Sequence, residues 1–81
     1  MLSDADLNIL AASPAIYADY SRAIRQEYEL VPDDLYKTAR AKVLRTFLDR
    51  STIYARPTSQ QLWEDAARSN LTAEIRELEA R

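Results

Sequence analysis

Residues 58–80 read TSQQLWEDAARSNLTAEIRELEA, and their apolar side chains recur at intervals of three and four. The residues that share this spacing are Trp63, Ala67, Leu71, Ile75 and Leu78. Such spacing places side chains on one face of an α-helix. Thr58 and Gln61 match a capping box, in which a hydroxyl and an amide satisfy free N–H groups at a helix start. The stretch predicts an amphipathic helix over residues 58–80.

The prolines and one early serine mark where the other helices begin. Ser13 gives an N-cap, and Pro14 follows at the first helical position, where a missing N–H costs nothing. Pro32 precedes two acids of an opening turn, and Ser3 is a further N-cap candidate. These signals divide the rest of the chain into three helical segments: about 3–12, 14–30 and 33–51.

The apolar spacing supports this division. In the second and third segments it is kept by Tyr17, Tyr20, Ile24, Tyr28 and Val31, and by Tyr36, Ala39, Val43 and Phe47. No alternating strand pattern continues beyond four residues. The predicted fold is all-α, a small bundle of three main helices plus a short N-terminal helix, in a single domain spanning residues 1–81. In the RSTIYARPTS stretch (50–59), Ile53 and Tyr54 are expected to anchor an interhelical loop, and a ligand-binding loop is the alternative.

The composition excludes several kinds of chemistry. The 81 residues contain no histidine, no cysteine and no glycine. Without histidine the chain lacks the usual general base and the commonest zinc ligand, and without cysteine it lacks disulfides and thiolate metal sites. Without glycine it has no glycine-rich phosphate loop. No apolar run is long enough to cross a bilayer, and no signal-peptide pattern is visible, so we expect a cytoplasmic protein without a membrane partner.

Charge is unevenly distributed, although the net charge is only −2. Residues 33–56 carry six Lys or Arg and three Asp or Glu, which gives a local charge of +3 between acidic neighbours. Ion pairs between helices are the first interpretation, and an anion-binding face is the second. Because the flanking segments are acidic, we expect no nucleic-acid partner.

Arg40 lies beside the apolar face of its predicted helix, so we expect its side chain to be partly buried. A buried arginine requires a carboxylate or phosphate partner. Internal pairing with Glu27 or Asp19 is the first expectation, and binding of an external anion is the alternative.

The aromatic residues leave a similar choice. A tyrosine stripe at helical spacing is typical of a core with its hydroxyls at the rim, whereas Tyr17, Tyr20 and Trp63 form the alternative, an interaction surface. Several large side chains are not all expected to be hidden by three helices: Tyr17, Ile24, Phe47, Trp63 and Ile75. Uncovered apolar surface favours self-association, so the sequence predicts a homo-oligomer.

The stretch SDADLNIL (3–10) places Asp4 and Asp6 ahead of an apolar run. Acids in the first turn of a helix are favoured by the helix dipole, and this is the simpler interpretation. The alternative is that they ligate a metal ion.

A resemblance extends from about Asp4 to Leu78. The stretches DADLNIL, YADYSRAIRQEYELVPDDLYKTARAKVLRTFLDRSTIYARP and LWEDAARSNLTAEI together resemble the C-terminal part of the HD-domain family of predicted metal-dependent phosphohydrolases. In the subgroup concerned, a DADL-type motif is followed by an R-x-E-Y…V-P-D helix junction. An arginine-bearing helix ending F-L-x-R, an I-Y loop and a W-E…A-R-x-N-L helix complete the pattern.

The resemblance implies a divalent metal held by His, a His-Asp pair and a distal Asp, which activates water for attack on a phosphate ester. It places Asp4 at the distal Asp position, with Asp6 as its neighbour, and Arg40 at the position of the helix arginine. Ala39 stands where many relatives have glycine. The His and His-Asp ligands are absent, because the chain starts at the distal Asp.

One or two neighbouring carboxylates cannot hold a divalent ion without further ligands. We therefore expect a catalytically incompetent helical fragment or module that resembles the C-terminal part of a phosphohydrolase of unassigned substrate. An upstream hydrolase fragment is its expected partner, and this chain alone is expected to hold no cofactor. The alternative is an independent helical protein-interaction module that self-associates.

Overall fold

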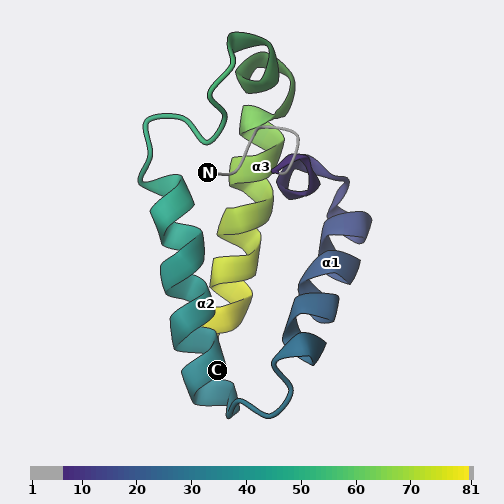
Figure 1. Ribbon diagram of the computed structural model, residues 1–81, viewed down its shortest axis with the longest axis vertical. Coiled ribbons are helices and arrows are strands. Elements are labelled where there is room, and N and C mark those ends of the chain that lie inside the picture. Colours follow the sequence, from purple (N-terminus) through teal and green to yellow (C-terminus); the bar gives the residue numbers. More distant parts are fainter. Residues whose placement is uncertain (1–6, 81) are drawn as a thin grey trace.

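The computed structural model describes residues 7–80. Within this range a 3-10 turn, η1 (Asn8–Ala11), precedes three α-helices: α1 (Pro14–Glu27), α2 (Asp33–Leu48) and α3 (Pro57–Glu79). The described residues contain no strand. The prediction of an all-α bundle with three main helices and a short N-terminal helical element is confirmed (Figure 1).

The longest helix, α3, organises the bundle. It packs most extensively with η1 and α2, and in Figure 1 α1 and α2 stand on opposite sides of it. Its predicted apolar face supplies the centre of the core, because Ala67 and Leu71 are completely buried. The other buried apolar side chains of the core cluster are Leu7, Leu10, Tyr17, Leu44, Ile53, Tyr54 and Ile75.

The helix starts follow the prolines, but the predicted capping box is wrong. Pro14 and Pro57 occupy the first turn of α1 and α3, and no cap residue of these helices makes a side-chain capping bond. Because α3 already begins at Pro57, Thr58 and Gln61 lie inside the helix. The prediction that Ser3 caps the first helix lies outside the described residues.

Two helices end earlier than predicted. α1 ends at Glu27, and the Arg25 guanidinium donates to the carbonyls of Tyr28 (2.7 Å) and Val31 (3.0 Å) in the turn that follows. The residue before a proline is forced out of the helical conformation, which accounts for the turn ahead of Pro32. α2 ends at Leu48, whose carbonyl accepts a hydrogen bond from the Arg68 side chain of α3.

The expectation that the five large side chains named above are not all hidden is confirmed. Tyr17 and Ile75 are buried, whereas Ile24, Phe47 and Trp63 are half-buried. The large apolar side chains that remain exposed are different ones: Ile16, Tyr28, Leu30, Leu35, Val43 and Leu62. No helix among residues 7–80 combines the length and the apolar character that crossing a membrane requires.

Candidate functional site

A buried ion pair joins α2 to α3. Arg40 Nε donates to Glu74 Oε2 at 2.9 Å and Arg40 Nη2 donates to Glu74 Oε1 at 3.2 Å. The two side chains are only 11% and 7% exposed. Two parallel hydrogen bonds between a guanidinium and a carboxylate give the strongest and most directional kind of ion pair. The prediction that Arg40 is partly buried is therefore confirmed.

The predicted partner of Arg40 is wrong. Asp19 forms an exposed pair with Arg22, one turn further along α1, and Glu27 lies exposed at the end of that helix. Glu74 instead reaches Arg40 from the neighbouring helix. The guanidinium of Arg40 already binds the carboxylate of Glu74 within the chain. The geometry therefore favours a role of Arg40 in holding the helices together over the binding of an external anion.

The same carboxylate also holds α1. The Tyr17 hydroxyl donates to Glu74 Oε1, so one glutamate connects all three α-helices. Burial and the nearby Glu74 carboxylate raise the pKa of Tyr17 above its ordinary value. Burial alone lowers the pKa of Arg40, but the hydrogen bonds and charge of Glu74 outweigh it and raise that pKa. We call Tyr17, Arg40 and Glu74 the buried triad.

A second buried tyrosine lies close to this triad. The Tyr36 side chain is 8% exposed, and its hydroxyl has no hydrogen-bond partner among residues 7–80. The Arg25 guanidinium carbon lies 4.5 Å from the centroid of the Tyr36 ring, a cation–π contact. Burial raises the pKa of Tyr36. Nothing in the sequence distinguishes this unpaired tyrosine from Tyr17.

Two polar side chains fix η1 to the bundle. Asn70 of α3 donates from Nδ2 to the carbonyls of Leu10 and Ala12, both at 2.8 Å. The Tyr54 hydroxyl donates to the Leu7 carbonyl at 2.9 Å. Because Leu7 follows Asp6 directly, these bonds fix the backbone at the point where the acidic motif joins the bundle. Asp4 and Asp6 themselves lie outside the described residues.

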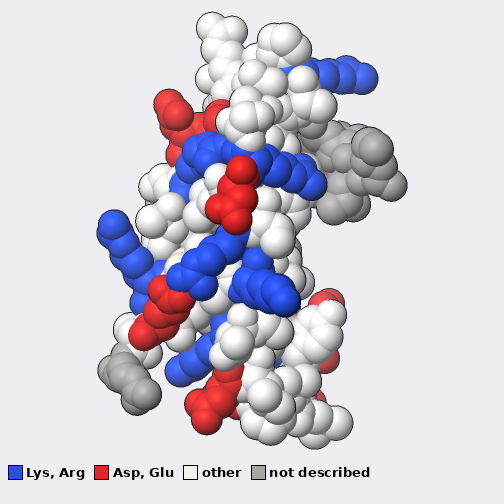
Figure 2. Space-filling view, turned by 90° about the vertical axis from the view of Figure 1, so that its left-hand side faces the viewer, with Lys and Arg blue, Asp and Glu red and all other residues white. Residues whose placement is uncertain are grey.

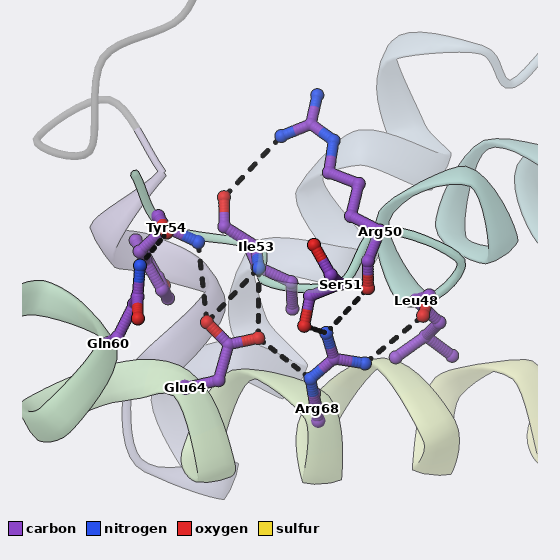
Figure 3. Close-up of polar contacts among 8 residues, drawn as sticks. All are labelled: Leu48, Arg50, Ser51, Ile53, Tyr54, Gln60, Glu64 and Arg68. Atoms are coloured by element: carbon purple, nitrogen blue, oxygen red, sulfur yellow. Dashed lines mark hydrogen bonds and ion pairs between the residues drawn. The ribbon is translucent and has the colours of Figure 1, made fainter. Parts of the chain in front are cut away.

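The α2–α3 loop is held by two residues one helical turn apart. Figure 3 shows Glu64 and Arg68 reaching from α3 into this loop. Glu64 accepts from the backbone N–H groups of Ile53 (2.9 and 3.1 Å) and Tyr54 (3.3 Å). Arg68 donates to the carbonyls at the end of α2 and in the loop: Leu48 (3.1 Å), Arg50 (2.9 Å) and Ser51 (3.3 Å).

These two side chains also form an ion pair, with Arg68 Nε 2.7 Å from Glu64 Oε2. Burial raises the pKa of Glu64, but the backbone N–H groups of Ile53 and Tyr54 and the Arg68 guanidinium outweigh this effect and hold it below its ordinary value. Ile53 and Tyr54 are 2% and 0% exposed, so the prediction that they anchor the loop is confirmed. At the start of α2, Asp33 pairs with Arg25 at 2.6 Å.

The basic segment does not form a uniform positive surface. On the face seen in Figure 2, Lys and Arg side chains alternate with Asp and Glu. Arg40 and Arg45 of α2 pair with Glu74 and Glu79 of α3. Pairing between α2 and α3 thus accounts for part of the charge asymmetry read from the sequence.

The remaining predicted site residues are dispersed over the bundle. Tyr17 is buried in the triad, Tyr20 packs with it at 5.6 Å between ring centroids, and Trp63 meets the Tyr54 ring at 5.4 Å. An interaction surface formed by Tyr17, Tyr20 and Trp63 stays a prediction. Among residues 7–80, no three acidic side chains gather closely enough to hold a metal ion.

Asn70 and Glu74 were missed by the sequence analysis. Both are buried polar residues of α3, and they lie four residues apart, directly beside the apolar face. Their spacing is the only signal in the sequence, and it equally fits a polar residue at the edge of an exposed face. No family model matches the chain, and neither the curated proteins nor the solved structures gave a match. The resemblance to HD-domain phosphohydrolases stays a prediction.

Proposed function

We propose that these helices form the C-terminal module of a metal-dependent phosphohydrolase and that the module is inactive by itself. In this proposal Asp4 supplies one carboxylate to a divalent metal, and the histidine ligands come from outside these 81 residues. When bound, the metal lowers the pKa of a water that attacks a phosphate ester. The order of motifs from DADL to W-E…A-R-x-N-L is the starting point of the proposal.

The observation that carries the proposal is the anchoring of η1. A four-residue 3-10 turn has little stability of its own, yet here Asn70 binds the carbonyls of Leu10 and Ala12, and Tyr54 binds that of Leu7. A metal-ligating carboxylate requires a support that keeps it within a fraction of an ångström of its position. Rigid attachment of Leu7, the residue next to Asp6, supports a role in presenting the acidic motif.

The buried triad supports the same role. Glu74 binds side chains of α1 and α2, so it sets the positions of both helices relative to α3. The Nε and Nη2 donors of Arg40 are already bonded to Glu74 within the chain. In this proposal Arg40 therefore holds α2 and α3 together. We therefore propose that Arg40 stabilises the fold and that Asp4 ligates the metal.

The first test measures metal binding by the chain alone. Titration with Mn²⁺ or Zn²⁺ in a calorimeter should show no affinity tighter than millimolar, because a divalent ion needs more ligands than the DADL acids supply. Micromolar binding by the isolated chain would refute the claim that the module is incomplete.

The second test supplies the missing ligands. The chain is mixed with a polypeptide that carries the histidine and His-Asp motifs of the family, and hydrolysis of p-nitrophenyl phosphate is followed with Mn²⁺ present. Activity should appear only in the mixture and should be lost with Asp4→Asn. The matched control is Asp65→Asn, since Asp65 is an exposed acid of α3 without an ion pair among the described residues. Equal activity with Asp4→Asn and Asp65→Asn would refute the assignment.

The second candidate function is a helical protein-interaction module that self-associates. The observation in its favour is the set of exposed apolar side chains, among which Leu30 is 94% and Leu35 is 64% exposed. An unchanged lack of phosphatase activity in the mixture, together with a defined oligomer, would favour this candidate over the first.

A further inference from the structure

The exposed face of α2 carries a regular apolar row. Leu35, Ala39 and Val43 follow one another at intervals of four, which places them along one side of the helix. Leu35 is 64% and Val43 49% exposed, and Ala39 is exposed as well. These three residues point away from the core, which α2 meets through Tyr36, Ala41 and Leu44. We call Leu35, Ala39 and Val43 the α2 row.

We infer that the α2 row is the interface of a homodimer, in which two α2 helices pack antiparallel about a two-fold axis at Ala39. The row is symmetric about this residue, because a larger apolar side chain stands four positions away on each side. In an antiparallel pair, Leu35 of one copy therefore meets Val43 of the other. The small Ala39 side chain allows the two helices to approach closely at the axis.

The charges on α2 favour the antiparallel direction. The helix opens with Asp33 and Asp34, and its second half carries Lys42 and Arg45. Neither Asp34 nor Lys42 forms an ion pair within the described part of the chain. Because Asp33 and Arg45 are already paired within each chain, the charges that matter are Asp34 and Lys42. Antiparallel packing about Ala39 brings Asp34 of each copy to nearly the same level along the helices as Lys42 of the other, whereas parallel packing would place each beside its own kind.

The size of the α2 row determines how tightly the two copies are expected to bind each other. α2 has 16 residues and is about 24 Å long, so a single helix face buries less than the roughly 800 Å² per partner of a standard interface. Leu30, in the turn just ahead of α2, is exposed as well. We therefore expect a reversible dimer whose population changes over the micromolar to millimolar range.

This inference deepens the second candidate function and does not depend on the phosphohydrolase proposal. The first experiment is sedimentation velocity across that concentration range. Leu35→Glu and Val43→Glu should each raise the dimer dissociation constant by about tenfold or more, because each buries a charge within the interface. The matched control is Leu62→Glu on α3, where the side chain is equally exposed at 66% but lies off the α2 row.

Single cysteine variants test the orientation, because the chain has no cysteine of its own. Under oxidation Ala39→Cys should form a disulfide-linked dimer, since residue 39 meets itself at the axis. Leu35→Cys should not, because the two copies of residue 35 lie about 12 Å apart along the helices, beyond the reach of a disulfide. Linkage of both variants to the same extent would contradict the antiparallel arrangement.

Each result of the sedimentation experiment decides a different point. A dimer weakened by Leu35→Glu and Val43→Glu but not by Leu62→Glu supports the α2 row. A dimer weakened only by Leu62→Glu overturns this surface and leaves self-association standing. A monomer at every concentration overturns both. Circular dichroism of the three variants should match the parent chain, because all three side chains are exposed.

Discussion

Tyr17 and Tyr36 are both buried tyrosines, but their hydroxyl groups have opposite surroundings. Tyr17 donates to the Glu74 carboxylate, whereas the Tyr36 hydroxyl finds no partner among residues 7–80. A hydrogen bond to a charged group contributes more to stability than one between neutral groups, and an unpaired buried polar group costs free energy. Two chemically identical substitutions should therefore have different effects.

We predict that Tyr17→Phe lowers the free energy of unfolding by about 1.5–3 kcal/mol, because Glu74 loses a donor in a buried site. Tyr36→Phe should leave it unchanged or raise it by up to about 1 kcal/mol, since the hydroxyl that is removed has no partner. Urea unfolding followed by the fluorescence of Trp63, the single tryptophan, measures both values. Equal losses for the two variants would contradict the assignment of these hydroxyls.

At the scale of elements, η1 depends on contacts from outside itself. Asn70→Asp keeps the shape of the side chain but replaces the amide donor with a carboxylate that faces two carbonyls. We predict that this change lowers the free energy of unfolding by about 2–3 kcal/mol at neutral pH, because it leaves buried polar groups unpaired. The control is Ser69→Asp, which adds the same charge at the exposed neighbouring position and should cost less than about 0.5 kcal/mol. Thermal and urea unfolding of the two variants check this expectation.

The loop between α2 and α3 should respond to acid through Glu64. The pKa of this carboxyl is lower in the folded chain than its ordinary value of 4.5, so the folded state binds fewer protons than the unfolded state in that range. Its contribution to stability is therefore complete above about pH 4.5 and is lost as the pH falls through the folded pKa. We predict that the stability difference between the parent chain and Glu64→Gln shrinks from pH 6 to pH 3. A difference that stays constant or grows on acidification would contradict this role.

The elements of the fold could be predicted from the sequence because they depend on local signals. Pro14, Pro32 and Pro57 stand at or next to the helix starts, and apolar spacing defines the buried face of α3. The helix ends could not be predicted in the same way. α2, for example, ends where its Leu48 carbonyl accepts a hydrogen bond from Arg68, twenty residues further along the chain. Local capping patterns carry no information about such a distant partner.

The candidate site was less predictable for the same reason. That Arg40 would be buried followed from its position beside an apolar face, but the choice among several carboxylates depends on how the helices pack. Glu74 lies 34 residues from Arg40 and 57 from Tyr17, so no spacing rule connects them. Asn70 is equally remote from the carbonyls that it binds.

At the scale of the whole molecule, the helices differ in how firmly they are held. α3 contributes six buried residues, α2 three and α1 only Tyr17. Local opening follows the amount of buried contact, so α1 should open at lower free energy than the rest of the bundle. The pair between Arg40 and Glu74 does not involve α1 and should survive such an opening.

We predict that amide hydrogens of α1 exchange faster than those in the middle of α3, as measured by NMR. Tyr17→Phe should speed exchange in α1 further, because it removes the hydrogen bond from α1 to Glu74. Uniform exchange throughout α1 and α3 would show that the bundle opens only as a whole.

The attachment of η1 also determines when this segment becomes ordered during synthesis. The carbonyls of Leu10 and Ala12 receive their hydrogen bonds from Asn70, 60 and 58 residues later. A ribosome must therefore release Asn70 before these two carbonyls can receive their hydrogen bonds, so η1 emerges before α3 but is fixed only after it. A partner that needs η1 in place therefore has to wait until α3 has been made.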